Sequence, residues 1–143
     1  MHGLRWWLVR VWAAPYTLIG LTVGCLCLLT GGRVRSHSGV LEFHGGAVPR
    51  VLNRLPLPHV LAVTLGHVVL GRHRDALELT RTHERVHVAQ FERWGPLMGI
   101  AYLACSAALW CRGRDAYRDN PFEREAFERG QAIPTLAERI SPR

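Results

Sequence analysis

The stretch RTHERVHVAQ, residues 81–90, decides the predicted fold of this chain. It contains an HExxH pattern, in which His83 and His87 are four positions apart and Glu84 directly follows the first histidine. On an α-helix, positions four apart lie on one face about one turn from each other, so both imidazoles can bind one metal ion. Glu84 lies about 100° around the helix from His83 and can therefore act on a water molecule beside the ion. The pattern predicts zinc ligands at His83 and His87 and a general base at Glu84.

A helix whose two histidines simply face solvent is the alternative interpretation of the same pattern. The neighbouring residues argue against it, because Thr80, His83, His87, Gln90 and Trp94 recur at spacings of three and four. That spacing places a polar stripe on one helical face between apolar neighbours. Gln90 lies one turn beyond His87, where it either hydrogen-bonds a ligand histidine or the substrate, or is an exposed glutamine.

The segment around this stripe, residues 75–95, has helical periodicity. Leu79, Val86 and Phe91 are spaced so that they share much of one apolar side. Gly95 followed by Pro96 is a typical helix stop. We therefore predict one long helix that carries the HExxH pattern.

A catalytic zinc site has three protein ligands and keeps one position open, so a third ligand is expected elsewhere in the chain. The segment NPFEREAFERG, residues 120–130, reads as a helix with Asn120 as N-cap, Pro121 at its first position and Gly130 as its stop. Glu123 and Glu125 are two apart on this helix and face different ways, so at most one of them reaches the metal. Each also has a simpler explanation. Glu123 has the spacing of a capping box with Asn120, and Glu125 suits a solvated first turn.

The N-terminal residues predict a membrane helix. No residue from 11 to 32 is charged, which is about the length that crosses a bilayer, and arginines lie on both sides of this run. Trp6, Trp7 and Trp12 gather at one end, as aromatic residues do at membrane interfaces. A cleaved signal peptide is the rival interpretation, but the run is long for one and no clear cleavage site follows it.

The middle of the chain predicts short strands, and a second apolar run follows the long helix. Residues 33–46 and 59–71 are rich in β-branched residues and contain turn glycines, which indicates two or three strands, with a proline-containing connector at 51–58. Residues 96–111 are uncharged but shorter than a comfortable membrane span. This run is a helix that is buried, half-embedded or tilted across a membrane.

Composition excludes some function classes. The chain has 143 residues, 48% of them hydrophobic, and a formal net charge of +7. Its basic residues are all arginine and are spread along the chain, and no nucleic-acid-binding motif accompanies them, so nucleic acid is not an expected partner. The four cysteines do not have metal-finger spacing and read as small apolar residues.

The motifs THERVHVAQ and NPFEREA together resemble the gluzincin metallopeptidases, in which a glutamate from a later helix joins HExxH. They also resemble short, largely uncharacterised bacterial membrane proteins that carry both motifs. Several gluzincin groups have the third ligand in an E-x-x-A pattern, which Glu123 and Ala126 match here. The resemblance therefore implies Glu123 as the third ligand, with Glu125 in reserve. Many of those families have an aspartate after the alanine, where this chain has Phe127.

The same resemblance implies two further features of a peptidase. Gluzincins hold an extended substrate against the edge of a small sheet, and residues 60–70 are the segment that would supply this edge. A side chain that stabilises the oxyanion is also expected, and Tyr102, Tyr117, His67 and His73 are the candidates.

These observations predict an α+β protein in two parts. Residues 1–32 are the membrane anchor, and residues 33–143 are a small zincin-like domain with a short antiparallel sheet, the HExxH helix and a later helix carrying the third ligand. The predicted function is zinc-dependent hydrolysis of peptide bonds at a membrane, on a peptide or protein substrate. Because the domain is so short, a partner protein that completes the cleft is also considered. The alternative is a non-catalytic membrane protein whose metal site is structural or absent.

Overall fold

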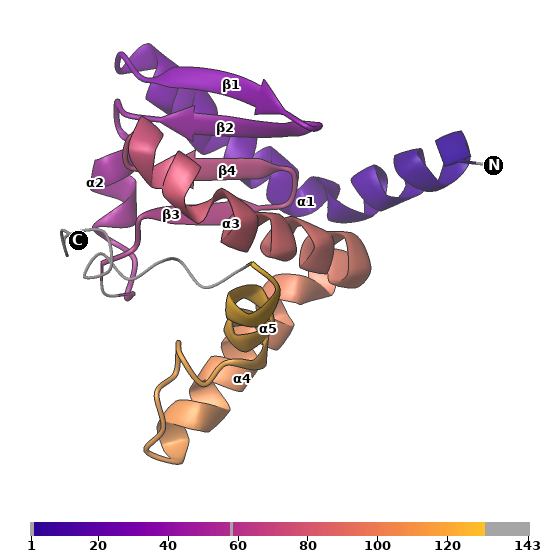
Figure 1. The fold of residues 1–143 in the computed structure, drawn as a ribbon, viewed down its shortest axis with the longest axis vertical. Coiled ribbons are helices and arrows are strands. Elements are labelled where there is room, and N and C mark those ends of the chain that lie inside the picture. The colour runs from indigo at the N-terminus through magenta and orange to yellow at the C-terminus, as the bar shows by residue number, and fades with distance from the viewer. Residues whose placement is uncertain (1, 58, 131–143) are drawn as a thin grey trace, which may run out of the picture.

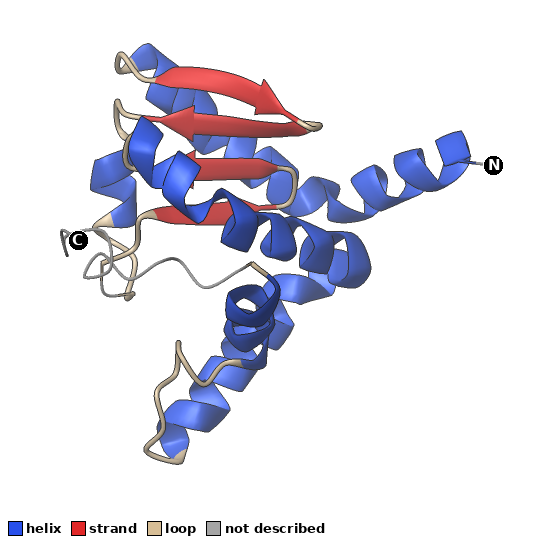
Figure 2. Ribbon diagram, viewed as in Figure 1, coloured by secondary structure: helices blue, strands red, loops and turns tan. Residues whose placement is uncertain are grey.

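The computed structural model describes residues 2–57 and 59–130, and these form an α+β fold around a four-stranded sheet (Figures 1 and 2). The strands are β1 (Arg33–His37), β2 (Val40–His44), β3 (Ala62–Leu65) and β4 (Val68–Gly71). Their order in the sheet is β1-β2-β4-β3.

The sheet is mixed, so the expectation of an antiparallel sheet is wrong in one respect. β1 pairs antiparallel with β2, and β3 with β4, but β2 and β4 are parallel neighbours. The reason is the connection after β2. The chain leaves through α2 (Val48–Leu52), forms β3 at the far edge, and returns as β4 between β3 and β2. The predicted connector at 51–58 thus begins inside a helix.

Helices cover both faces of the sheet, which makes β4 the most buried strand, with all four of its residues buried. One face packs against α3 (Arg74–Trp94), where Val40, Ala62, Val69, Leu77 and Val88 form a core cluster. The buried apolar residues of α3 are Ala76, Leu77, Val88 and Phe91, whereas Leu79 and Val86 of the predicted apolar side are only half buried. Pairs that a sequence pattern places on one side can differ in burial because the neighbouring layer covers only part of a helix.

The other face packs against α1 (His2–Leu29) and α2, around Cys27, Phe43, Val48, Leu52, Val68 and Leu70. Two glycines one helical turn apart let α1 approach the sheet closely. A Cβ atom at Gly20 would lie 2.7 Å from the Cβ of Val68, and one at Gly24 would lie 2.6 Å from the ring of Phe43. The helix expected to be a separate anchor is therefore also a packed layer of the fold (Figure 1).

The chain continues from α3 through the 3-10 turn η1 (Gly95–Leu97) into α4 (Met98–Cys111), and then returns as α5 (Pro121–Arg129) beside α3. Most of the apolar surface of α4 is exposed, because only Met98 and Leu109 are buried in it. Of the options for the second apolar run, a helix buried within the protein does not match this exposure.

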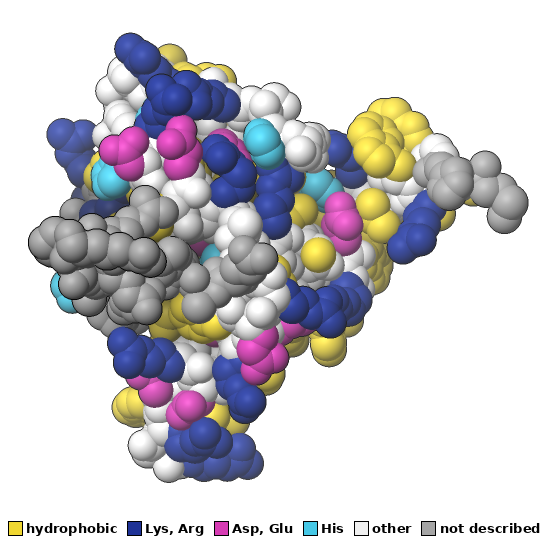
Figure 3. Space-filling model, in the orientation of Figure 1, with side chains coloured by type: hydrophobic (Ala, Val, Ile, Leu, Met, Phe, Trp, Pro, Cys, Tyr) yellow, Lys and Arg dark blue, Asp and Glu magenta, His cyan; other side chains and the backbone are white. Residues whose placement is uncertain are grey.

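Two helical segments, Gly3–Leu29 and Arg74–Cys111, are long and apolar enough by length and composition to span a membrane. In the second, the long uncharged part is residues 94–111. Exposed apolar side chains also gather where α1 protrudes beyond the sheet, including Leu4, Trp6, Trp7 and Leu8 (Figure 3). Arginines are scattered over the visible face of the molecule rather than gathered in one patch (Figure 3).

Candidate metal centre

Helix α3 presents both histidines of the HExxH pattern to the protein interior. His83, Glu84 and His87 are each at most 8% exposed, so the interpretation as a solvated helix face is wrong. The N-cap of this helix is His73, whose Nδ1 accepts a hydrogen bond from the backbone N–H of Ala76 at 3.1 Å. His73 thus lies at the far end of α3 and caps it, away from the other histidines.

Helix α5 supplies Glu123 from the opposite side. Its N-cap is Asn120, as predicted, and Asn120 Oδ1 accepts from the backbone N–H of Phe122 at 3.0 Å. The Asn120 amide also donates to the carbonyl of Tyr102 and to Ser106 Oγ, so the start of α5 is fixed to α4. The backbone N–H of Asn120 donates to the Tyr117 carbonyl instead of the Glu123 carboxylate. The capping box therefore does not form, and Glu123 is free to face the histidines.

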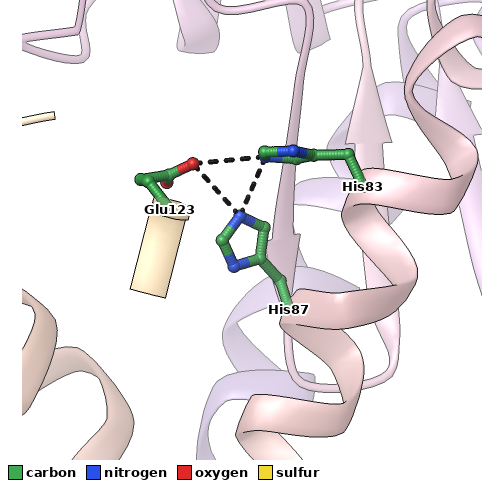
Figure 4. Close-up of side chains that lie close together, drawn as sticks. All are labelled: His83, His87 and Glu123. Carbon is green, nitrogen blue, oxygen red and sulfur yellow. Dashed lines mark hydrogen bonds and ion pairs between the residues drawn. The ribbon is translucent and has the colours of Figure 1, made fainter. Parts of the chain in front are cut away.

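Three donor atoms converge between α3 and α5 (Figure 4). The Nε2 atoms of His83 and His87 are 3.1 Å apart, and Glu123 Oε2 lies 3.2 Å from the first and 3.5 Å from the second. Zinc bonds of about 2.0–2.1 Å in a tetrahedron imply ligand separations of about 3.3 Å. The three separations observed therefore match three corners of a zinc-sized tetrahedron.

The hydrogen bonding of the cluster also fits a cation. Among the described residues, Glu123 Oε2 is a buried oxygen with no hydrogen-bond partner, although it faces two imidazole nitrogens. Buried carboxylate oxygens are costly without a partner. A divalent ion between the three atoms would supply that partner, and two imidazoles with one carboxylate are a donor set that zinc accepts.

Gln90 holds His87 in the orientation that a ligand needs. The Gln90 amide nitrogen donates to the Phe122 carbonyl and to Glu125 Oε2, both at 2.9 Å, so its Oε1 is the acceptor. That oxygen lies 2.9 Å from His87 Nδ1, which therefore donates to it. In the neutral imidazole the lone pair is then on Nε2, facing the cluster. Gln90 is fully buried, so it is not the exposed glutamine of the alternative interpretation.

Tyr102 from α4 holds the carboxylate. Its hydroxyl donates to Glu123 Oε1 at 2.8 Å, which leaves Oε2 as the oxygen directed at the histidines. His83 is supported differently, because its Nδ1 has no hydrogen-bond partner among the described residues. The ring of Phe127 packs against the His83 ring, with centroids 4.7 Å apart. The residue that departs from the gluzincin pattern thus contacts the first histidine through packing.

The charges of the cluster stabilise one another. Burial by itself would lower the pKa of His87, but the carboxylates of Glu123 and Glu84 outweigh burial and raise this pKa to about 9. Burial by itself would raise the pKa of Glu123, but the imidazoles of His83 and His87 beside its Oε2 and the hydrogen bond from Tyr102 to its Oε1 lower it to about 2. Without a metal the cluster therefore holds an imidazolium next to a carboxylate at neutral pH, and a metal ion must displace that proton.

Glu84 lies beside the three donors without joining them. Its Oε2 accepts a hydrogen bond from the hydroxyl of Thr64 on β3 at 2.6 Å. Both residues line a cavity of about 410 Å³ that the three donors also line. A buried carboxylate next to the cluster, with one oxygen held by Thr64, is suitably placed to accept a proton from a water molecule in the cavity.

The other candidate residues have different roles or positions. Glu125, the reserve ligand, pairs with Arg93 and Arg129 on the outer side of α5 and lies outside the cluster. His67 pairs with Glu92 at 2.9 Å and does not line the cavity. Tyr102 and Tyr117 both line the cavity, so these two remain candidates for the side chain that stabilises the oxyanion.

Sequence reasoning did not identify two contributors to this region. Thr64 had no signal as a partner of Glu84, because 20 positions separate them and only the packing of β3 on α3 joins them. The Gly20-x-x-x-Gly24 spacing was present in the sequence and is a known signal of close helix packing. It positions α1 against the sheet whose other face supports α3.

A comparison of the chain with models of known protein families, with characterised proteins and with solved structures finds no match.

Proposed function

We propose that this chain is a membrane-associated zinc metallopeptidase that hydrolyses peptide bonds. The observation that carries the proposal is the convergence of His83, His87 and Glu123 at separations that fit a tetrahedral zinc ion, with Glu84 beside them in a cavity. Structural zinc sites have four protein ligands, whereas catalytic sites have three and an open position. Three donors that line a cavity favour the catalytic class over a structural metal site.

The residues have distinct roles in this proposal. Zinc held by the three donors would lower the pKa of a water molecule and polarise a peptide carbonyl. Glu84 accepts the proton of that water as its oxygen adds to the carbonyl carbon, and then donates the proton to the leaving amine as the C–N bond breaks. Thr64 holds Glu84 Oε2 and Gln90 holds His87, so both chemical groups keep their orientation during the reaction.

Membrane association is the second part of the proposal. Helices α1 and α4 expose apolar side chains that a bilayer or its interface would cover, including three tryptophans near the start of α1. Because α1 packs on the sheet, the catalytic part of the chain would lie at the membrane surface rather than on a flexible tether.

The test measures zinc and hydrolysis together in the detergent-purified full chain. We expect about one zinc per chain, lost in His83→Ala and Glu123→Ala and kept in Glu125→Ala, which changes the same helix outside the cluster. Glu84→Gln should keep the zinc but abolish cleavage of a peptide library. Full activity of Glu84→Gln, or no zinc in the wild-type protein after reconstitution at neutral pH, would refute the proposal and favour a non-catalytic membrane protein.

A further inference from the structure

We infer that the cavity accepts the interior of an apolar peptide segment, so that the protein is an endopeptidase and not an exopeptidase. This inference rests on the proposed function and specifies its substrate class. Two independent features of the cavity carry it. The first is the charge of its wall, which does not suit a peptide terminus. The second is the shape and character of its wall, which has a free strand edge and mainly apolar side chains.

The charges of the cavity wall do not suit a peptide terminus. An enzyme that removes residues from a C-terminus needs a cation for the terminal carboxylate, and one that acts at an N-terminus needs a free carboxylate for the ammonium group. Although the chain has 18 basic residues, no arginine is among the described residues that line the cavity. The two carboxylates of the described wall are Glu84 and Glu123, and both are assigned to the reaction itself. Apart from the imidazole of His59, the described wall therefore has no side chain left to pair with the charge at either end of a peptide.

The backbone beside the cluster suits an extended segment. β3 pairs only with β4 among the described strands, and its residues line the cavity along the unpaired edge. The carbonyl of Leu61 accepts from the backbone N–H of Arg72, on the side of β4. Because backbone groups alternate along a strand, those of Ala62 and Thr64 point to the free edge. A peptide running along this edge needs no terminus to be held.

The side chains of the wall are mainly apolar and come from three parts of the fold. Val63 and Leu65 belong to the edge strand, Met98 and Leu103 to α4, and Tyr16 to α1. Leu103 is 68% exposed although it lines the cavity, so the apolar wall continues onto the outer surface of α4. An apolar segment near a membrane surface would reach the cluster along this continuous surface.

The same helix offers a matched pair of positions for the test. Leu103 lines the cavity, whereas Ile100 has nearly the same exposure, 66%, and does not. Leu103→Asp and Ile100→Asp therefore place the same charge on the same exposed apolar helix, and both disturb membrane contact similarly. Only the first places the charge in the cavity wall.

The experiment measures binding to the full-length Glu84→Gln protein in lipid nanodiscs by fluorescence anisotropy. The probes are ten-residue peptides labelled on a flanking lysine side chain, with a central Ala-Phe-Leu-Val core and termini that are either acetylated and amidated or free. A third peptide replaces this core by Ser-Glu-Lys-Ser. We expect the blocked and free apolar peptides to bind within about twofold of each other and the charged core to bind at least tenfold more weakly. Leu103→Asp should weaken apolar binding about tenfold and Ile100→Asp should not.

Binding that requires a free terminus, no binding of the blocked apolar peptide, or equal effects of the two aspartate substitutions would overturn the inference. A cleavage assay of the same peptides with the protein that retains Glu84 distinguishes failure of this inference from failure of the proposed function. If the blocked peptide binds but is not cleaved, hydrolysis fails and the apolar-segment site stands. If cleavage releases only terminal residues, hydrolysis stands and the endopeptidase inference fails.

Discussion

The ion pair between His87 and Glu123 predicts that pH acts in opposite directions on the zinc-free protein and on its metal affinity. The pKa of His87 in the folded protein is about 9, above its ordinary value of 6.5. The stability that the pair contributes is therefore complete below pH 6.5 and is lost as the pH rises through 9. At about 1.4 kcal/mol per unit, this loss is about 3 kcal/mol.

Metal affinity should rise over the same range. Zinc binds the neutral imidazole, so the proton on His87 competes with it, and a pKa of about 9 weakens apparent binding about 100-fold at pH 7. The affinity should increase about tenfold per pH unit from pH 7 and level off near pH 9. A histidine with its ordinary pKa would instead level off near pH 6.5.

The assay is denaturant unfolding of the chelator-treated full chain between pH 6 and 9, together with zinc titrations against a competing chelator at each pH. His87→Gln is the control. It removes the titrating group, so the free energy of unfolding of the zinc-free variant should no longer fall between pH 6 and 9. Zinc-free stability that stays constant or increases up to pH 9, or affinity that levels off near pH 6.5, would refute the coupling of His87 to the Glu123 carboxylate.

Three other perturbations test parts of the structure. Glu42→Gln should destabilise the fold by about 3 kcal/mol in denaturant unfolding, because it leaves the Arg81 guanidinium without the buried carboxylate that it contacts at 2.9 and 3.0 Å; an unchanged midpoint would contradict this pairing. Gly24→Leu should cost about 3 kcal/mol by the same measurement, since even its Cβ would lie 2.6 Å from the ring of Phe43, and a silent substitution would mean that α1 does not pack on the sheet. Tyr102→Phe should lower zinc affinity about tenfold or more in chelator competition, because the carboxylate of Glu123 loses the hydroxyl that orients it; equal affinity would exclude that role.

The elements of the site that depend on local geometry were predictable from the sequence. The helical period of 3.6 residues places His83 and His87 on one face, and it did so in the structure as expected. Asn120, Pro121 and Gly130 marked the ends of the later helix because capping depends on residues within one turn. The long apolar run at the N-terminus was predictable in the same way, as one helix.

Other features depended on how distant segments pack, and the sequence left them open or pointed elsewhere. The parallel pairing of β2 and β4 arises from a crossover whose direction no local pattern contains. The contact of Arg81 with Glu42 joins residues 39 positions apart, and nothing near either residue indicates the other. The close packing of α1 on the sheet required the shape of the sheet as well as the glycines of the helix.

By itself, the sequence determined that two histidines and a glutamate lie together on one turn of a helix, because an α-helix sets the direction of side chains four positions apart. It also supplied two carboxylates, Glu123 and Glu125, either of which could complete the cluster. Only the tertiary structure decided between them. The capping and hydrogen bonds of Asn120 fix α5 to α4 at one rotation, in which Glu123 faces the histidines and Glu125 faces Arg93. That rotation depends on contacts between three helices, and no periodicity within one helix can define it.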